Sequence, residues 1–442
     1  MAYHQLFTDF FMSDRRKFLH QVSASAAAIL SHSTLIPGRI PTVLEQITGI
    51  THDVTDDEAF WFTVQKAFTV DRSLINLNSG GVSPSPRIVQ EAMKGHLDYS
   101  NEAPVYTMWR ILEPQREGVR QRLALEFGCD SEEIALTRNA SEGLQICQFG
   151  LDFEPGDEVL TTTQDYGRMI TTFKQRERRD GIILKQFPLP IPSEDPKEIV
   201  NLFESHIAPR TRAILMCHMI NITGQILPVK QVTQMARRKG IPVIVDGAHA
   251  FGHFDFKHDD LDCDYYASSL HKWLLAPHGT GMLYVRKDKI KTLWPLMAAS
   301  EGMDEDIRKY EEIGTHPAAN YLAIAEALTF HQGIGAKRKE KRLRYLRDYW
   351  AKQLVQHDRV RLHTSLKPEF SCCIGTVQIE GIDTADLGVH LWNEHRIIAT
   401  PIKHEEFEGL RVTANLFTTL EELDRFVDAM ERVIHKGLSP KE

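Results

Sequence analysis

Strand-like apolar runs alternate with helical patterns through the middle of the chain. The runs cover residues 158–162, 181–187, 211–218 and 241–246, and segments with the spacing of a helix separate them. Strands that are separated by helices form βαβ units, and such units build a mostly parallel sheet. The sequence therefore predicts an α/β fold whose core is a mostly parallel sheet.

Asp246 ends the last of these runs, and Lys272 follows it within the segment 268–273. We expect Asp246 at the carboxyl end of a buried parallel strand, which is the edge where doubly wound sheets bind ligands. A lysine amine can condense with an aldehyde, and a carboxylate can keep a pyridine nitrogen protonated. The pair indicates an enzyme with a Schiff-base cofactor, although a surface lysine beside a helix-capping aspartate explains these two residues equally well.

A second candidate site lies where a strand predicted at 133–137 turns into a helix. Asn139, Ala140 and Ser141 stand at this turn. The N-terminus of a helix presents free backbone N–H groups and a positive dipole end, so it can bind an anion. Plain N-capping by Asn139 or Ser141 explains the same residues without a ligand. Asn78, in a turn rich in Gly and Pro, is open to the same two interpretations.

Histidines and acids are concentrated in residues 249–263. His249 and His253 are four residues apart, as metal ligands on one face of a helix are, and His258 follows them. Gly252 and the alternating Phe-Asp-Phe segment after it favour a loop instead. We therefore assign no metal ligand, and we keep a metal-dependent enzyme that uses these three histidines as an alternative.

The N-terminus resembles a twin-arginine export signal. Arg15 and Arg16 are followed by Phe18 and Leu19, then by an Ala- and Ser-rich stretch and a region of small residues. The pattern departs from the usual signal at positions 14 and 20, and no Ala-x-Ala cleavage site follows. We expect residues 1–38 to be a leader and the protein to be exported to the periplasm. A basic leader on a cytoplasmic protein is the alternative.

Composition excludes some classes of partner. The formal net charge is −8, so we expect no general attraction to nucleic acid or to anionic membranes. No uninterrupted apolar run is long enough to span a bilayer. The six cysteines form no C-x-x-C motif, and most lie in apolar contexts where a cysteine is usually a small buried residue.

A second α/β pattern follows near the C-terminus. A strongly helical, basic stretch precedes strand-like runs at 359–364, 372–380 and 410–414, and a final helix is predicted at 420–436. This indicates a smaller C-terminal α/β domain after the large one. The predicted division is a leader at 1–38, a segment at 39–73 that packs on the small domain, a large cofactor-binding domain at 74–312, and the small domain at 313–442.

Taken in order, these motifs resemble the class V aminotransferase family of pyridoxal-phosphate enzymes, the group that contains cysteine desulfurases and isopenicillin N epimerase. The resemblance covers about residues 74–430. It implies a fold-type-I pyridoxal-phosphate transferase with a mostly parallel large domain and a smaller C-terminal α/β domain. It also implies pyridoxal 5'-phosphate as cofactor and a reaction at the α-carbon of an amino acid.

The resemblance also implies roles for four residues around the cofactor ring. Lys272 forms the Schiff base and then moves the proton at the α-carbon. Asp246 pairs with the pyridinium nitrogen, so that the ring can accept electrons. His249 lies near the ring hydroxyl, and Tyr166 stacks on the ring face, where many desulfurases have a histidine.

Phosphate and substrate contacts follow from the same resemblance. The residues that bind the cofactor phosphate are Ala140 and Ser141, aided by Ser269 and His271. Gly314-Thr315 matches a pair that reaches the phosphate of the neighbouring subunit, so a homodimer with shared sites is implied. Arg411 matches the arginine that grips the substrate carboxylate, a task that suits a planar guanidinium. Asn78 matches an asparagine near the substrate entry.

One departure from the family pattern narrows the reaction. Desulfurases carry a nucleophilic cysteine on a loop shortly before the Arg411 segment, and residues 399–409 contain none. Cys372 and Cys373 fall on the preceding strand, so a desulfurase is not expected. Transamination, epimerisation and lyase chemistry stay open, with Tyr166 and the acid before it favouring the isopenicillin-N-epimerase-like branch. A non-catalytic binding protein is a further alternative, against which the intact Lys272 and Arg411 argue.

Overall fold

The computed structural model of the protein describes residues 42–438. The predicted leader, residues 1–38 with Arg15 and Arg16, lies outside the described residues. The described residues from 47 onward belong to one compact unit, and the fold below is that of this unit. Within residues 42–438, no helix is both long and apolar enough to cross a membrane.

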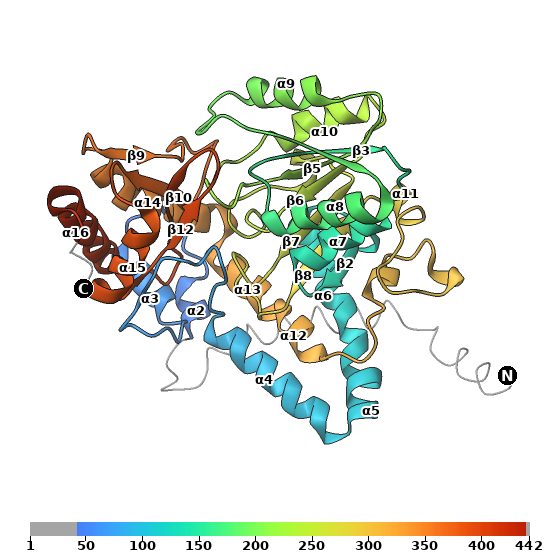
Figure 1. Ribbon diagram of the computed structural model, residues 1–442. Helices are drawn as coiled ribbons and strands as arrows, with labels where there is room; N and C mark the ends of the chain where they lie inside the picture. The colour runs from blue at the N-terminus through green and yellow to red at the C-terminus, as the bar shows by residue number, and fades with distance from the viewer. Residues whose placement is uncertain (1–41, 439–442) are drawn as a thin grey trace. The chain divides into compact units, whose positions relative to one another are not determined.

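The core is a seven-stranded sheet in the order β2-β8-β7-β6-β5-β3-β4 (Figure 1). Strands β3 to β7 pair in parallel, which confirms the predicted α/β fold with a mostly parallel sheet. The sequence patterns do not predict β8, which runs antiparallel to both of its neighbours, β2 and β7. The strands are β2 (Ile134–Thr137), β3 (Glu158–Thr162), β4 (Ile183–Phe187), β5 (Thr211–Cys217), β6 (Val243–Asp246), β7 (Tyr265–Ser269) and β8 (Gly281–Val285).

Alternate side chains of the central strands face two helical layers, as the pleat of a strand requires. In β6, Val243 and Val245 belong to a buried cluster with side chains of α6, α9 and α10, whereas Ile244 packs with α7 and α8. Figure 1 shows α7 and α8 side by side against the strands. These helices are α6 (Arg116–Phe127), α7 (Ala140–Gly150), α8 (Gly167–Asp180), α9 (Pro196–His206) and α10 (Val229–Arg237).

The helical segment before α6 is interrupted twice. α4 (Arg87–Glu102) is followed by α5 (Pro104–Tyr106), a π-helical turn η2 (Thr107–Leu112) and a 3₁₀ turn η3 (Glu113–Gln115). The interruptions lie at Pro104 and Pro114, because proline lacks a backbone N–H and its ring clashes with the preceding turn. The remaining short elements are α2 (Val43–Ile47), η4 (Ser131–Glu133), η5 (His258–Asp260), α11 (Lys287–Ile290), η6 (Glu301–Met303) and η7 (Ile307–Glu311).

A second sheet, four-stranded and antiparallel, has the order β12-β13-β10-β9. Helices α14 and α16 pack together beside it, which gives the smaller C-terminal α/β unit that the sequence predicts. The patterns do not predict β12, because it is an edge strand with half-exposed side chains and contains Pro401. The elements are β9 (Val360–Leu362), β10 (Ile374–Ile379), β12 (Thr400–Lys403), β13 (Glu408–Thr413), α14 (Ala336–Leu354), α15 (Thr384–His395) and α16 (Leu420–Lys436).

Two helices that follow the predicted domain boundary at residue 312 belong to the core of the large sheet. Tyr321 of α12 (Ala318–Leu322) and Leu328 of α13 (Ile324–Ile334) lie in the same buried cluster as β5 and β6. The contacts of α12 and α13 with α4 and α6 bury their apolar faces there. The boundary at residue 312 stays a prediction, because the described residues from 47 onward belong to one compact unit.

The residues before the first sheet strand pack against the C-terminal part of the chain. In α3 (Glu58–Gln65), Gln65 Nε2 donates to the backbone oxygen of Thr418 at 3.3 Å. Glu58 forms an ion pair with Arg342 of α14 at 2.5 Å. These contacts join the described part of the predicted 39–73 segment to the small unit. The next strand, β1 (Ile75–Asn76), pairs in parallel with β11 (Ile397–Ile398).

Candidate active site

A cavity of about 170 Å³ lies at the carboxyl ends of the parallel strands. The loops that follow β3, β5, β6 and β7 all open toward it, because parallel strands end at one edge of the sheet. Every cofactor-binding residue predicted from the sequence lines it except Thr315. The cavity, called here the Lys272 cavity, is lined by Gly81, Asn139, Ala140, Ser141, Leu144, Tyr166, Cys217, Met219, Asn221, Asp246, Ala248, His249, Ser269, His271 and Lys272.

Asp246 and Lys272 are the carboxyl group and the amine among the residues that line this cavity. Asp246 is the last residue of β6, as predicted, and its Oδ1 accepts a hydrogen bond from the N–H of Ala248 at 2.9 Å. Burial raises the pKa of Asp246 to about 6, and the nearby Lys272 charge only partly offsets this. Burial likewise lowers the pKa of Lys272 to about 8. The Lys272 amine therefore loses its proton near pH 8 instead of above pH 10, and among the described residues Asp246 has no cationic partner in direct contact.

His249 lies between Lys272 and Trp273. Its Nε2 is 3.0 Å from the Lys272 Nζ, and its Nδ1 accepts a hydrogen bond from the Trp273 indole N–H at 3.3 Å. Burial lowers the pKa of His249 well below its usual range, so the imidazole is neutral. The structure thus places His249 beside Lys272, and the predicted position of His249 near the ring hydroxyl stays a prediction.

The N-terminus of α7 forms one wall of the cavity. Asn139 caps the helix by accepting from the N–H of Glu142 at 2.9 Å, which leaves Ala140 and Ser141 at the cavity. The N–H of Ala140 donates to Ser269 Oγ at 3.0 Å, so the hydroxyl proton of Ser269 is available to a ligand. His271, whose Nδ1 lies 3.2 Å from the backbone oxygen of Thr280, stands beside them. The Ser269 hydroxyl, the start of the helix and the helix dipole together suit a phosphate.

Arg411 lies on β13 and is 7% exposed. Its Nη1 donates to the backbone oxygen of Asn221 at 3.0 Å, and its Nη2 donates to Asn78 Oδ1 at 2.9 Å. Among the described residues, its Nε has no partner and no carboxylate pairs with it. Burial lowers the pKa of Arg411 to about 10. A buried guanidinium held only by neutral groups is a receptor for an anion such as a carboxylate.

Arg411 and Asn78 do not line the Lys272 cavity directly. They reach it through Asn221, which lines it and whose side-chain oxygen is buried without a partner in the described chain. Asn221, Cys217 and Met219 were not predicted from the sequence as site residues. Cys217 ends β5 and the other two follow it, so their position could have indicated the site, since the ends of neighbouring parallel strands share one edge.

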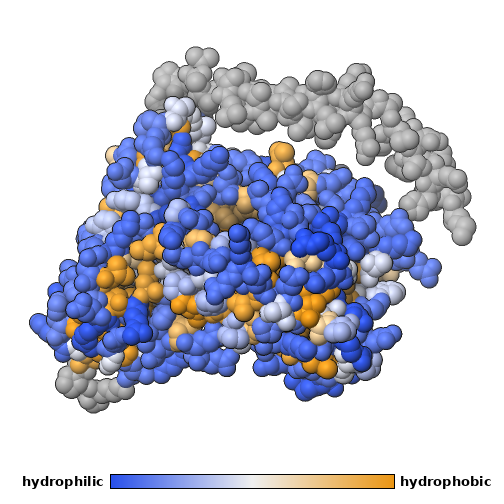
Figure 2. Space-filling view, turned by 90° about the horizontal axis from the view of Figure 1, so that it is seen from above, coloured by the Kyte–Doolittle hydropathy of each residue, from blue (hydrophilic) through white to orange (hydrophobic). Residues whose placement is uncertain are grey.

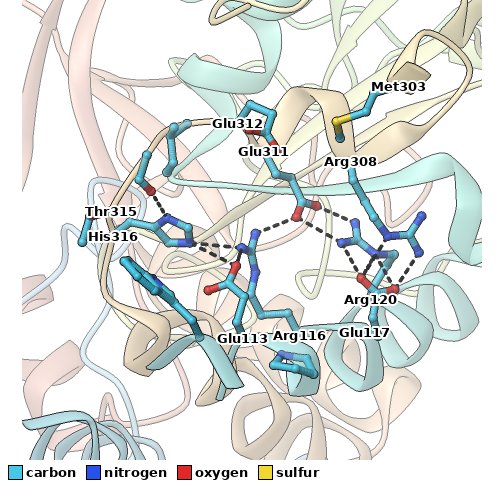
Figure 3. A pocket seen from close by; sticks show the side chains of 14 residues that line it. Glu113, Arg116, Glu117, Arg120, Met303, Arg308, Glu311, Glu312, Thr315 and His316 are labelled. Carbon is cyan, nitrogen blue, oxygen red and sulfur yellow. Dashed lines mark hydrogen bonds and ion pairs between the residues drawn. The ribbon is translucent and has the colours of Figure 1, made fainter. Parts of the chain in front are cut away.

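Thr315 lies away from the Lys272 cavity. It lines a second cavity, of about 620 Å³, together with Gly314 and Trp109 (Figure 3). In this second cavity Arg116 pairs with Glu311 at 2.6 Å, and its Nη1 lies 3.0 Å from His316 Nε2. The role of Thr315 at the phosphate of a neighbouring subunit stays a prediction, because a single chain is described.

His253 and His258 do not form a metal site with His249. The Nε2 of His253 accepts from the backbone N–H of Cys373 at 2.9 Å, and its Nδ1 lies 2.7 Å from the backbone oxygen of His249. Both ring nitrogens are therefore used. The Nε2 of His258 lies 3.3 Å from the backbone oxygen of Cys263. Within residues 42–438, no three His, Cys, Asp or Glu side chains are placed to hold a metal ion.

The loop between β12 and β13 occupies the place where desulfurases carry a cysteine. Glu406 accepts hydrogen bonds from the hydroxyl of Thr163 and, at 2.7 Å, from Gln164 Nε2. His404 Nε2 lies 3.0 Å from the backbone oxygen of Thr163. This loop is thereby fixed to the segment that leads into Tyr166.

Comparisons with known proteins agree with this geometry. A family model described as Aminotransferase class-V matches residues 75–401. The chain is 31% identical over 390 residues to the isopenicillin N epimerase of Streptomyces clavuligerus, which covers 84% of this chain and 98% of that protein. It is 24% identical over 383 residues to a probable cysteine desulfurase of Halalkalibacterium halodurans, covering 81% and 93%. A solved structure of a C-DES mutant with glycine covalently linked to its PLP cofactor matches with a TM-score of 0.74 at 23% identity, covering 82% and 98%.

Proposed function

The chain belongs to the class V aminotransferase family, and from this premise we propose that it is an amino-acid epimerase similar to isopenicillin N epimerase and not a cysteine desulfurase. The family match confirms the predicted family, the predicted fold and pyridoxal phosphate as cofactor. It also confirms that the enzyme acts at the α-carbon of an amino acid. The choice of epimerisation is the proposal.

The residues of the Lys272 cavity fit pyridoxal phosphate. Asp246 is a buried carboxyl group that needs a cationic N–H partner, and the N-terminus of α7 with Ser269 suits the phosphate. When bound, the cofactor stabilises the negative charge that forms at the substrate α-carbon. Lys272 supplies the amine that holds the cofactor aldehyde and that moves the α-proton. Arg411, aided by Asn78, binds the substrate carboxylate.

One observation favours epimerisation over transamination. Lys272 follows β7 and Tyr166 follows β3, and the sheet order places β6 and β5 between those two strands. The two side chains therefore approach the space above Asp246 from opposite sides. Inversion at a carbon needs one group to remove a proton and another to deliver it on the other face. The Tyr166 phenol forms no hydrogen bond with a described residue, and Arg411 is close enough to interact with it.

Cysteine chemistry has little support in the cavity. Cys217, at the end of β5, is the only cysteine among the described residues that line it. Burial raises the pKa of Cys217 well above its usual range, whereas a nucleophilic cysteine needs a low pKa. The loop that would carry a mobile thiol instead carries Glu406, which is bound to Gln164.

The test is the fate of the α-hydrogen in deuterated water. A panel of L- and D-amino acids, including amide-extended ones, is incubated with the loaded enzyme. We expect deuterium at the α-carbon together with formation of the opposite enantiomer, and no keto acid. Tyr166→Phe should keep exchange from one enantiomer but lose inversion. Keto acid as the main product would favour transamination, and alanine with released sulfur from cysteine would favour a desulfurase.

A homodimer with shared sites is also part of the proposal. Val105, Tyr106 and Trp109 are 69%, 61% and 53% exposed, and Trp109 lines the same second cavity as Thr315. On the face in Figure 2, hydrophobic residues gather in separate patches among hydrophilic ones. Light scattering should give twice the chain mass. Mixing Lys272→Ala with Thr315→Ala subunits should restore part of the activity if Thr315 serves the partner's site.

Export through the twin-arginine route is proposed from the leader alone, since Arg15 and Arg16 lie outside the described residues. Replacing both arginines by lysine should keep the protein in the cytoplasm, where cell fractionation would detect it. Periplasmic accumulation of the double variant would contradict the proposal.

A further inference from the structure

Two sets of hydrogen bonds meet at His249, one at its backbone oxygen and one at its ring, and the ring contacts Lys272. The backbone N–H of Cys373 donates to His253 Nε2 at 2.9 Å, and His253 Nδ1 lies 2.7 Å from the backbone oxygen of His249. The Trp273 indole N–H donates to His249 Nδ1 at 3.3 Å. The other ring nitrogen of His249, Nε2, lies 3.0 Å from Lys272 Nζ.

The chemistry of these groups fixes where the protons lie. A backbone N–H and an indole N–H can only donate, so His253 Nε2 and His249 Nδ1 must be acceptors without a proton. Each imidazole then carries its single proton on the other nitrogen. His253 donates from Nδ1 to the carbonyl of His249, and His249 presents an Nε2–H to Lys272. The Lys272 amine must accept this hydrogen bond, which only a neutral amine can do.

The packing around Trp273 leaves its indole little freedom. The His253 ring stacks on it with centroids 3.5 Å apart and planes 6° apart. The backbone oxygen of Trp273 accepts a hydrogen bond from the buried Lys339 amine. A Cβ on Gly252 would lie 2.9 Å from the backbone nitrogen of Leu274, so the turn that carries His249 packs directly on this segment.

We propose that Trp273, held by His253, is a positioning residue that keeps the proton of His249 on Nε2 and thereby favours the neutral form of the Lys272 amine. A neutral amine is the form that attacks an aldehyde and that accepts the α-proton. Only the expected effect on turnover rests on the proposed function. The positions of the protons belong to the protein itself and can be measured without a substrate.

Other charges also act on Lys272, so the test must isolate the contribution of the tautomer. Asp246 on β6 and Cys217 on β5 favour the protonated amine, whereas Arg411 on β13 and burial disfavour it. None of these groups contacts the Trp273 indole nitrogen. Removing that N–H alone should therefore change the tautomer of His249 and leave the other contributions in place.

The experiment compares Trp273→Phe with Trp61→Phe. Trp61 is a matched control, since both indoles are 0% exposed and Trp61 Nε1 donates to the backbone oxygen of Val54 at 2.6 Å, outside the cavity. The ¹⁵N spectrum of the histidine rings is measured on cofactor-free and on cofactor-loaded protein. The rate at which an acylating reagent modifies Lys272 is measured as a function of pH on the cofactor-free form alone.

We expect His249 with its proton on Nε2 in the wild type and in Trp61→Phe, and mixed tautomers in Trp273→Phe. With His249 Nε2 then free to accept, Lys272 can donate to it as an ammonium group. The midpoint of Lys272 modification should rise by about half to one pH unit in Trp273→Phe, and kcat should fall about fivefold. Neither change should occur in Trp61→Phe.

Two results would overturn the inference: unchanged ring signals and an unchanged Lys272 profile in Trp273→Phe, or an equal shift in Trp61→Phe. If Trp273→Phe does not fold, benzothienylalanine at position 273 keeps the shape and burial of the indole but lacks the N–H, and it decides the same question. Failure of the wild type to turn over any amino acid would count against the proposed function, while the tautomer and the Lys272 profile would still test this inference.

Discussion

Arg116 and Arg411 are both almost completely buried, with 6% and 7% of their surfaces exposed. Arg116, in the second cavity, pairs with the carboxylate of Glu311 at 2.6 Å (Figure 3). Within residues 42–438, Arg411, beside the Lys272 cavity, donates hydrogen bonds only to the carbonyl of Asn221, the side-chain oxygen of Asn78 and, at a longer distance, one hydroxyl group. The buried guanidinium is therefore paired with a carboxylate in the second cavity and held by neutral groups beside the Lys272 cavity.

The difference shows at which of the two sites a ligand has to supply the opposite charge. A buried ion lowers stability unless an opposite charge and hydrogen bonds compensate its lost hydration. In the second cavity the protein itself provides the carboxylates. In the Lys272 cavity burial lowers the pKa of Arg411 to about 10 and that of Lys272 to about 8, and it raises the pKa of Asp246 to about 6. A substrate carboxylate and a pyridinium ring would supply the missing partners.

The largest expected effect comes from Lys272→Ala. The enzyme should lose the group that holds the cofactor aldehyde and moves the α-proton, so turnover should fall at least about a thousandfold. Stability of the cofactor-free protein should not fall, since a buried amine in an unfavourable environment is removed. Deuterium exchange at the α-carbon and chemical unfolding measure the two quantities.

Lys309→Met is the matched control for that variant. Lys309 is buried more completely than Lys272, and its amine donates to the backbone oxygens of Ile290 and Asp304 at 2.6 and 2.9 Å, outside the Lys272 cavity. We expect it to lower stability and to keep turnover. Equal loss of turnover in both variants would mean that burial of a lysine, and not its place in the cavity, matters.

The next largest effect is a loss of stability in Glu311→Gln. Glu311 accepts from Arg116 and Arg120, and also from the N–H of Leu136 at 2.6 Å. Removing its charge leaves two buried guanidinium groups without their shared carboxylate, which should lower the free energy of unfolding by about 3 kcal/mol. The control, Glu305→Gln, breaks an exposed pair with Lys291 and should change the urea midpoint little.

Sequence patterns alone predicted the parts of the site that come from strand ends. Asp246 ends a short apolar run, and Ala140 and Ser141 begin a helix after another, so local periodicity places them at one edge of the sheet. Lys272 follows β7, the neighbour of β6. To predict these features, it is enough to know that the carboxyl ends of parallel strands lie at one edge of the sheet.

The remaining contacts could not be predicted, because they join residues that are far apart in the chain. Arg411 and Asn78 are brought together by the pairing of Asn78 with Thr413, and no local pattern encodes this pairing. The contact of Trp273 with His249 depends on rotamers that packing decides. The packing of α12 and α13 on the large sheet could not be predicted either, because they have the apolar faces of any helix and only tertiary contacts show which core they join.

Asp246→Asn should change stability and function in opposite directions. The pKa of Asp246 is about 6 in the folded chain and near 3.8 when unfolded, so the neutral carboxyl favours folding at low pH and this benefit is lost as the pH rises through 6. An asparagine carries no charge at any of these pH values and can still accept from Ala248. The cofactor-free variant should gain up to about 3 kcal/mol at about pH 8 and nothing at low pH, while turnover falls.

The smallest effects come from the same conservative change at the two arginines that open the comparison. Lysine keeps the charge but has one compact donor group in place of the planar fork. In Arg116→Lys the lost contact with Glu311 should lower the free energy of unfolding by about 1 to 2 kcal/mol and leave KM unchanged. In Arg411→Lys stability should change little, because neutral groups hold the side chain, but KM for the amino acid should rise about tenfold at unchanged kcat. If Arg411→Lys instead destabilises the protein as much as Arg116→Lys and keeps KM, then Arg411 is a structural cation and the proposed substrate carboxylate must bind elsewhere.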